Sequence, residues 1–119
     1  DQTTDVPLRL LAAEVTREHL FRQLHQELPY ALTVETESWE DFQDGSVKIQ
    51  QMILVERDGQ KAIVIGKGGT RAKAVREAAQ AELEEMLERK VHLFLAVKVR
   101  QGWSEERDRF KDLGLDWDA

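Results

Sequence analysis

The sequence predicts an α+β domain, and three observations support this prediction. Two long segments carry apolar residues at helical spacing, and three shorter segments have the apolar or alternating pattern of strands. A glycine-rich tetrapeptide separates an apolar run from the second predicted helix. With 119 residues, of which 41% are hydrophobic, the chain is long enough for one domain with one core.

The first predicted helix spans residues 8–28. Residues 1–6 are polar and expected to be loose, Pro7 suits a first helical turn and Pro29 ends the helix. Its apolar stripe consists of Leu10, Ala13, Leu20, Phe21, Leu24 and Leu28.

Three further side chains of this helix need an interpretation. Arg17 lies inside the stripe, where we expect it to extend to solvent or to pair with Glu14. Leu11 and Val15 lie off the stripe, and we expect them to touch a neighbouring domain.

The next segments predict an antiparallel hairpin. Residues 30–39 alternate, with Leu32 and Val34 on the apolar side. Asp44-Gly45 marks the turn. Residues 47–55 form the second strand, whose apolar face is interrupted by Gln51. This face carries Val47, Ile49, Ile53 and Val55.

Residues 60–65 allow two interpretations. Ile63, Val64 and Ile65 are β-branched, which favours a strand. A short helix that ends at Gly66 has the same length, and periodicity cannot decide between the two over so few residues.

The second long helix is predicted over residues 71–89, with Thr70 as its N-cap. Its apolar stripe consists of Ala72, Val75, Ala79, Leu83 and Met86. Its first turns are basic and its later turns acidic, which opposes the helix macrodipole and favours an anion at its N-terminus. A third strand is predicted over residues 91–100, where apolar residues alternate. A short helix over residues 104–113 follows, and Gly114 ends it.

A basic island surrounds the glycine loop. Between Gly59 and Arg76 there are five basic residues and no acidic one, although the formal net charge of the chain is −6. Gly66 and Gly69 have no Cβ that would block the backbone of a ligand. This pattern favours a phosphate-bearing ligand. The alternative is that the two glycines only end one element and open the next.

The sequence lacks the motifs of several catalytic mechanisms. It has no cysteine and no nucleotide-hydrolysis loop of the form G-x-x-x-x-G-K-[ST]. His19, His25 and His92 do not have the spacing of metal ligands. We therefore expect no catalytic residue, no metal site and no enzymatic activity in this chain alone.

Val64-Ile65-Gly66-Lys67-Gly68-Gly69, followed by a long helix and a strand, resembles a KH domain. Further segments between residues 5 and 114 are similar to the C-terminal KH domain of Era-type bacterial GTPases, which act in ribosome assembly. These segments are Ala13-Glu14-Val15-Thr16-Arg17-Glu18, Glu27-Leu28-Pro29-Tyr30, Val55-Glu56-Arg57, Gln60-Lys61 and Val97-Lys98-Val99, with Trp103 beyond.

The resemblance implies a type II KH fold with element order α-β-β-α-α-β and a three-stranded mixed sheet packed against helices. It also implies that residues 60–65 form a helix. Residues 1–119 would form a single domain. In it, residues 1–7 would be a linker from an N-terminal GTPase domain, and residues 104–119 a short helix and tail.

For the site, the resemblance implies that Gly66, Lys67, Gly68 and Gly69 hold the backbone of a single-stranded RNA. Bases would lie on a floor formed by Ile65, Ala72 and the second strand. The full set of expected RNA-binding residues is Lys61, Ile65, Gly66, Lys67, Gly68, Gly69, Arg71, Ala72, Lys73 and Arg76. Two positions depart from the family: Ala72 replaces a larger aliphatic residue, and Arg76 often corresponds to glycine.

The resemblance also implies partners and location. The expected RNA is the 3′ end of 16S rRNA, and the other partners are the 30S subunit and the GTPase domain of the same protein, with no DNA. The expected location is the cytoplasm, with at most peripheral contact with the inner membrane. GTP and Mg are expected only in the GTPase domain, and no cofactor in this chain. The alternatives are a KH module of another parent protein, a degenerate KH domain that binds protein, and an enzyme fragment.

Overall fold

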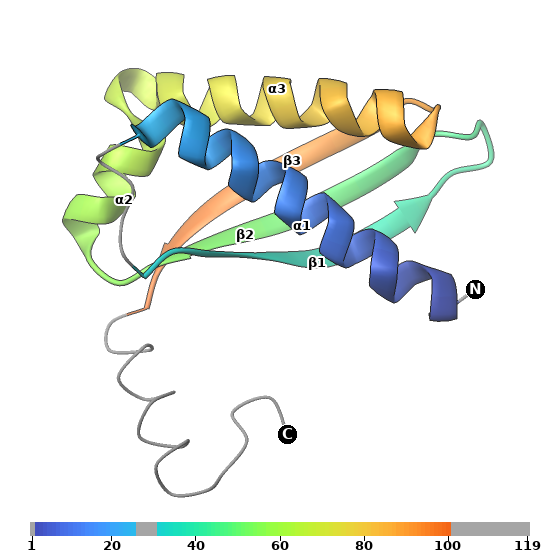
Figure 1. The fold of residues 1–119 in the computed structure, drawn as a ribbon, viewed down its shortest axis with the longest axis horizontal. Helices are drawn as coiled ribbons and strands as arrows, with labels where there is room; N and C mark the ends of the chain where they lie inside the picture. The colour runs from blue at the N-terminus through green and yellow to red at the C-terminus, as the bar shows by residue number, and fades with distance from the viewer. Residues whose placement is uncertain (1, 26–30, 101–119) are drawn as a thin grey trace, which may run out of the picture.

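The computed structural model describes residues 2–25 and 31–100 (Figure 1). Helices α1 and α3 pack on each other, α1 lies over β1, and α3 lies along β3 (Figure 1). The α+β prediction is confirmed. The elements are α1 (Gln2–Leu24), β1 (Thr33–Asp41), β2 (Val47–Val55), α2 (Asp58–Ile65), α3 (Thr70–Leu87) and β3 (Val91–Val99).

The sheet has the strand order β1-β2-β3 and is mixed, as predicted. Strands β1 and β2 pair antiparallel, whereas β2 and β3 pair parallel from Val47↔Val91 to Val55↔Val99. A parallel pair needs a crossover connection, which α2 and α3 supply. Strand β2 is therefore central, and within the described residues β3 pairs only with β2.

The strand predictions are largely confirmed. Strand β2 has the predicted bounds, β3 ends one residue early, and β1 begins at Thr33 rather than at residue 30. The predicted turn has Gly45 at φ +91°, and the Ser46 hydroxyl donates to Asp44 Oδ1 at 2.6 Å. This hydrogen bond, with a second from the Ser46 N–H, lowers the pKa of Asp44. The helix predicted over residues 104–113 lies outside the described residues.

Helix α1 differs from its prediction at both ends. It begins at Gln2 and contains Pro7, so residues 2–6, which we expected to be loose, are helical. It ends at Leu24, and His25 has φ +48°, so the predicted end at residue 28 is wrong. Residues 26–28 themselves lie outside the described part of the chain.

The buried face of α1 was predicted only in part, because Ala13, Leu20 and Leu24 of the predicted stripe are buried whereas two other members are not. Leu10 and Phe21, placed in the apolar stripe, are 65% and 46% exposed. Val15, which we expected to touch another domain, is buried in this one together with Ala12 and Thr16. At ~100° per residue, the true buried face is rotated by about one residue position. Small and polar residues lie at its centre. The large side chains of Leu10 and Phe21 therefore shifted the predicted face away from the true one.

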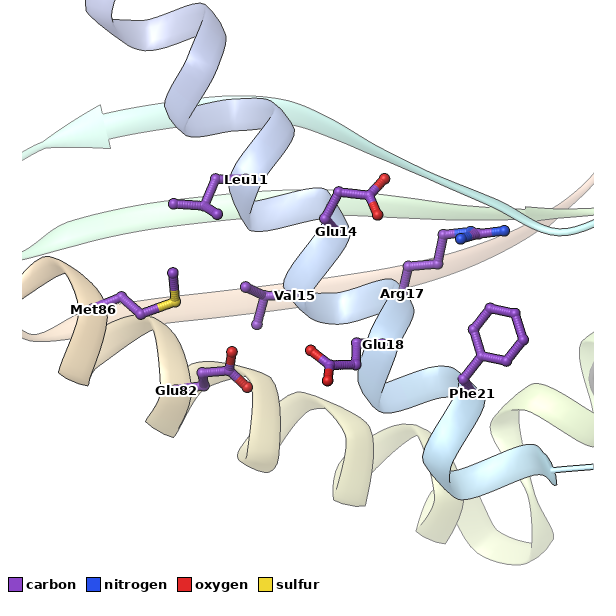
Figure 2. A pocket seen from close by; sticks show the side chains of 8 residues that line it. All are labelled: Leu11, Glu14, Val15, Arg17, Glu18, Phe21, Glu82 and Met86. Atoms are coloured by element: carbon purple, nitrogen blue, oxygen red, sulfur yellow. The ribbon is translucent and has the colours of Figure 1, made fainter.

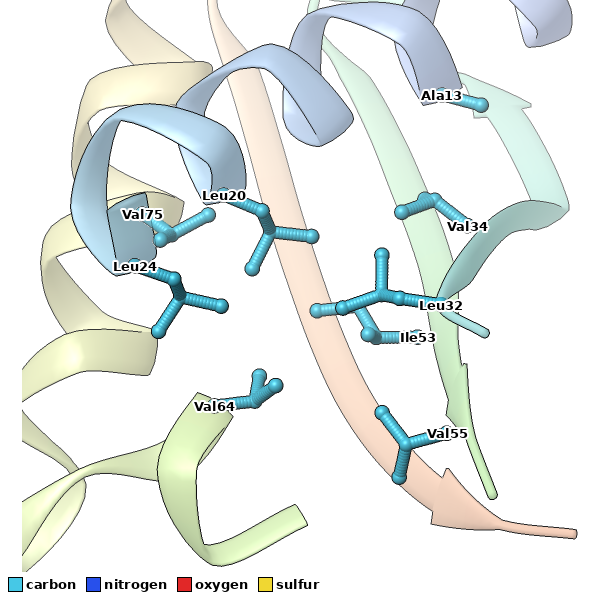
Figure 3. Packing of buried hydrophobic residues seen from close by; sticks show 9 residues of the cluster. All are labelled: Ala13, Leu20, Leu24, Leu32, Val34, Ile53, Val55, Val64 and Val75. Carbon is cyan, nitrogen blue, oxygen red and sulfur yellow. The ribbon is translucent and has the colours of Figure 1, made fainter. Parts of the chain in front are cut away.

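The core fills the space between the helices and the sheet and forms two clusters. One of them joins α1, the β1–β2 pair and the α2–α3 pair (Figure 3). The other joins α1 to β2, β3 and the middle of α3. Met86, placed in the apolar stripe of α3, is instead 46% exposed. The first cluster consists of Ala13, Leu20, Leu24, Leu32, Val34, Ile53, Val55, Val64 and Val75.

Gln51, the exception on the apolar face of β2, is explained by a buried polar chain. Its side chain is 2% exposed. Thr16 Oγ1 donates to Gln51 Oε1 at 2.5 Å, and Gln51 Nε2 donates to Thr36 Oγ1 at 3.2 Å. Thr36 Oγ1 in turn donates to the carbonyl of Arg9 at 2.8 Å. The amide therefore ties α1 to β1 and β2.

Residues 60–65 form the helix implied by the resemblance, not the strand favoured by propensity. Gln60 Oε1 accepts hydrogen bonds from the N–H groups of Glu56 and Arg57 at 2.9 and 3.0 Å. The side chain thus satisfies donors at the helix start. Val64 is fully buried and anchors α2 in the core.

The glycine loop joins α2 to α3 through three positive φ angles. Gly66 has φ +76° and ψ 172°, and Gly68 and Gly69 have φ +63° and +79°. A Cβ on Gly66 would lie 2.7 Å from Cγ of Arg71. We predicted Thr70 as the N-cap of α3, but the N-cap is Gly69. Thr70 is helical, and its hydroxyl donates to the carbonyl of Lys67 at 2.8 Å.

Helix α1 is 23 residues long, yet no helix in the described ranges combines the length and apolar character needed to cross a membrane.

The buried polar chain predicts a coupling between Thr16 and Gln51. Thr16→Val removes the donor to a buried Gln51 oxygen and is expected to lower the free energy of unfolding by about 1–3 kcal/mol. Adding Gln51→Leu removes the orphaned amide, so the double variant should lose less than the two single losses combined. Urea titrations measure both quantities, and Thr33→Val on half-exposed β1 is the control. Additive losses would contradict the coupling.

The loop conformation predicts that its glycines differ in tolerance. Gly66→Ala is expected to lower the free energy of unfolding by about 2 kcal/mol or more, because its φ and ψ suit only glycine and its Cβ would meet Arg71. Gly68→Ala has open space and should lose about 1 kcal/mol. Gly59→Ala, inside α2, is the control and should not destabilise. Equal losses at positions 66 and 68, measured by urea unfolding, would refute this loop geometry.

Candidate nucleic-acid interface

The ten predicted RNA-binding residues lie on one continuous stretch of structure. Lys61 and Ile65 are one helical turn apart on α2, so they share a face. Gly66–Gly69 form the loop, which continues through a 3-10 turn over Lys67–Gly69 into α3. The first two turns of α3 carry the remaining four residues, which are Arg71, Ala72, Lys73 and Arg76.

Two hydrogen bonds fix α3 along the outer edge of β3. Gln80 Oε1 accepts from the N–H of Leu93, and Glu84 Oε2 accepts from the N–H of Val91, both at 3.0 Å. These side chains occupy the edge of β3 that faces away from β2. They therefore close the space between α3 and the first half of β3.

The same alignment places the start of α3 beside the second half of β3. One turn back from Gln80 is Arg76, and two turns back is Ala72, at ~6 Å per step. The matching steps along β3 lead from Leu93 to Leu95 and Val97, at ~6.6 Å each. Because residues two apart share an edge, the backbone groups of Leu95 and Val97 point toward Arg76 and Ala72.

This second half of the edge is open in the described part of the chain. No side chain in residues 2–25 or 31–100 caps the N–H groups of Leu95 and Val97 as Gln80 caps Leu93. Arg76 extends toward the next turn of its own helix, with Nη1 3.5 Å from Gln80 Oε1. Ala72 presents only a methyl group. The open edge of β3 therefore lies opposite the start of α3 and next to the glycine loop.

We expect the floor for the bases on the second strand, and β2 is the central strand, paired on both of its edges. The strand beside α3 that has a free edge in the described residues is β3, because the crossover through α2 and α3 returns the chain to the outside of the sheet. The order of the strands could not be derived from their apolar patterns.

Basic side chains are concentrated around the glycine loop, but they differ in how exposed they are. Lys67, Gly68 and Lys73 are exposed, whereas Lys61, Arg71 and Arg76 are half-buried. Arg71 packs against Gly66, and its Nη1 lies 3.5 Å from the carbonyl of Ile63. Arg71 therefore stabilises the conformation of the loop through these two contacts.

The N-terminus of α3 has features that favour an anion, although the N–H of Thr70 already donates to the carbonyl of Lys67. Its first turn contains no acidic residue, and no side chain caps it. The first N–H groups of a helix have no partner within the helix, and the macrodipole adds partial positive charge there. A phosphate beside the loop would meet these N–H groups as well as Lys67.

The sequence analysis assigned no role to Gln80 or to Glu84. Their spacing could have identified them, because Ala72, Arg76, Gln80 and Glu84 follow one another by four residues on one side of α3. What could not be seen was that β3 lies opposite. Within the described ranges, no three His, Asp or Glu side chains gather in a way that could hold a metal ion.

A separate hollow lies between α1 and α3, where Leu11, Phe21 and Met86 leave apolar surface exposed (Figure 2). The guanidinium carbon of Arg17 lies 5.1 Å from the centre of the Phe21 ring, so Arg17 packs on an aromatic ring and the expected pair with Glu14 does not form. Another hollow lies between α1 and β1. Neither hollow is lined by any of the ten predicted residues.

Comparison with known proteins agrees with this architecture. The sequence pattern of the KH domain family matches residues 27–104. The chain is 59% identical over 119 residues to GTPase Era of Caulobacter vibrioides (strain NA1000 / CB15N) and 62% identical over 117 residues to GTPase Era of Dinoroseobacter shibae. It spans 38% of the length of each of these relatives.

Solved structures give the same result. Aquifex aeolicus Era bound to GDP.AlF4- superposes with a TM-score of 0.79 and 35% sequence identity. Era in complex with MgGDPNP and nucleotides 1506–1542 of 16S ribosomal RNA has the same score and identity. Each match covers 92% of this chain and 37% of the other. The chain therefore belongs to the KH domain family, and the resemblance to the KH domain of Era-type GTPases is confirmed.

Proposed function

We propose that this domain binds single-stranded RNA in the groove between the glycine loop and β3. The observation that carries the proposal is the position of a cationic, glycine-rich loop opposite an open strand edge. A KH groove holds about four nucleotides. Phosphates need positive charge and N–H donors, which the loop supplies, and bases need apolar contact and hydrogen-bonding groups, which the groove walls supply.

Each side of the groove has a distinct role in this proposal. Lys67, loop N–H groups and the start of α3 hold phosphates. Gly69 lets the RNA backbone come close, because a Cβ there would meet no atom within 4 Å, whereas the Cβ position of Gly66 is filled by Arg71. Ile65 and Ala72 form the apolar wall against which bases lie. The N–H and C=O groups of Leu95 and Val97 form hydrogen bonds with base edges.

Lys61, Lys73 and Arg76 add charge around this groove. Lys73 is exposed one position from Ala72, and Arg76 lies where the groove ends at Gln80. Arg76 can exchange its weak contact with Gln80 for a phosphate. Arg71 acts mainly through the shape of the loop, because it packs against Gly66.

The relatives suggest which RNA is bound and in what protein. Era has been crystallised with nucleotides of 16S ribosomal RNA, and this chain is similar to Era over its whole length. We infer that the ligand is the single-stranded 3′ end of 16S rRNA. The parent protein would then be a cytoplasmic GTPase acting in 30S subunit assembly, with GTP and Mg bound outside these 119 residues.

Reversing the charge of the loop tests the site. Lys67→Asp with Gly68→Asp should abolish RNA binding and leave the fold intact, since both residues are exposed and aspartate tolerates a positive φ at position 68. Lys90→Asp with Ala81→Asp makes the same change in net charge in the second half of α3 and just after it, and should keep most of the binding. Fluorescence anisotropy with a short single-stranded RNA at low salt measures both. Equal binding by the two double variants would refute the site.

The salt dependence tests how the RNA is held. Two or three neutralised phosphates predict a slope of about −1.4 to −2.1 for the logarithm of the binding constant against the logarithm of salt concentration. The Lys67→Asp variant should have a shallower slope. A slope near zero in the unmodified chain would show that phosphates are not the main contact.

A further inference from the structure

An aromatic and basic patch lies on the face of the sheet that the helices leave uncovered. We name it the sheet patch, and it consists of Phe42, Lys48, His92 and Phe94. Phe94 is 51% exposed and Phe42 is 39% exposed. Large apolar side chains at such exposure need an explanation when they gather at one place.

The members of the sheet patch contact one another in sequence. The Phe42 and His92 rings meet edge to face, with centroids 6.5 Å apart. His92 is the cross-strand neighbour of Lys48, and Lys48 Nζ lies 5.5 Å from the centre of the Phe94 ring. Together they offer aromatic surface next to an ammonium group. This is the combination that proteins use to stack a base and hold its phosphate.

The charge around the sheet patch suits a polyanion. Four cross-strand pairs of β2 and β3 share the uncovered face, and they contain Lys48, His92 and Lys98 but no acidic residue. On β1, Glu35 lies opposite Met52 and Glu40 lies opposite Lys48, and the carboxylate of Asp44 accepts hydrogen bonds from Ser46. Acidic side chains thus border the sheet patch on the β1 side, whereas the β3 side is basic.

Phe94 of the sheet patch and the open edge of β3 belong to the same strand. The groove ends where Gln80 caps Leu93, so an RNA strand cannot continue between α3 and the first half of β3. Next to Leu93 along the strand, Phe94 projects from the opposite face, because side chains alternate along a strand. The edge of β3 at Leu95 and Val97 is open in the described residues, which leaves a path from the groove to the uncovered face.

We infer that the sheet patch is a second contact for the same RNA, used by nucleotides beyond those in the groove. The ring of Phe94 stacks on a base, and Lys48 holds a phosphate. The inference rests on the proposed function, because the loop must first hold the strand. It makes the length of the RNA, and not only its sequence, a determinant of affinity.

The test compares two single-stranded RNAs from the 3′ end of 16S rRNA on the 119-residue chain. One has about five nucleotides, near the capacity of the groove, and the other has about twelve, within the range of a longer site. Phe94→Ala should weaken the longer RNA about five-fold or more and leave the shorter RNA unchanged. Phe94→Tyr should bind both RNAs as the unmodified chain does.

Phe21→Ala is the matched control. Phe21 is also an exposed phenylalanine beside a cation, at 46% exposure and 5.1 Å from Arg17, but it lies on α1. It should affect neither RNA. Circular dichroism melting verifies that each variant folds.

The outcomes separate the two proposals. Equal binding of the longer RNA by the unmodified chain and by Phe94→Ala overturns the inference, and so does an equal loss for both RNAs. Either result leaves the groove as the site, and the first would favour a protein as the ligand of the sheet patch. If the unmodified chain binds neither RNA, the proposed function fails and the inference fails with it.

Discussion

The hydrogen bonds from β3 to Gln80 and Glu84 decide where the glycine loop lies. They align α3 with β3 residue by residue, so the start of the helix must come beside the end of the strand. The side chains of Gln80 and Glu84 also bind the outward-facing N–H groups in the first half of β3. The open edge is therefore confined to the part opposite the loop, which gives the groove a fixed position and a fixed end.

The glycine loop works within this frame because its backbone leaves the ordinary regions of φ and ψ. Gly66 has a conformation that suits only glycine, and Arg71 fills the space that a side chain would take. The chain can then turn from α2 into α3, with the N–H groups of Gly66, Gly69 and Thr70 donating to carbonyls within the turn. A basic island on a protein of net charge −6 makes this turn attractive to an anion, whereas the remaining surface discourages unspecific contact with nucleic acid.

Several elements could be predicted from residues alone, because local patterns determine them. The bounds of β2, the alternation of β3 and the turn at Gly45 follow from spacing and from glycine. Residues 60–65 show the limit, since β-branched residues favour a strand there. The helix forms because Val64 reaches the core and Gln60 satisfies the helix start. The face of α1 was missed because a polar residue, Thr16, lies at its buried centre and pairs with Gln51. The position of β3 beside the loop was missed because strand order depends on the crossover and not on any local pattern.

The most direct test of the central claim is an NMR titration of the chain with a short single-stranded RNA from the 3′ end of 16S rRNA. We expect the amide shifts to concentrate on residues 61–76 and on β3 from Leu95 to Val99. Little change is expected along β1 or at the hollow between α1 and α3. Shifts confined to that hollow, or no shifts at saturating RNA, would contradict the proposed groove.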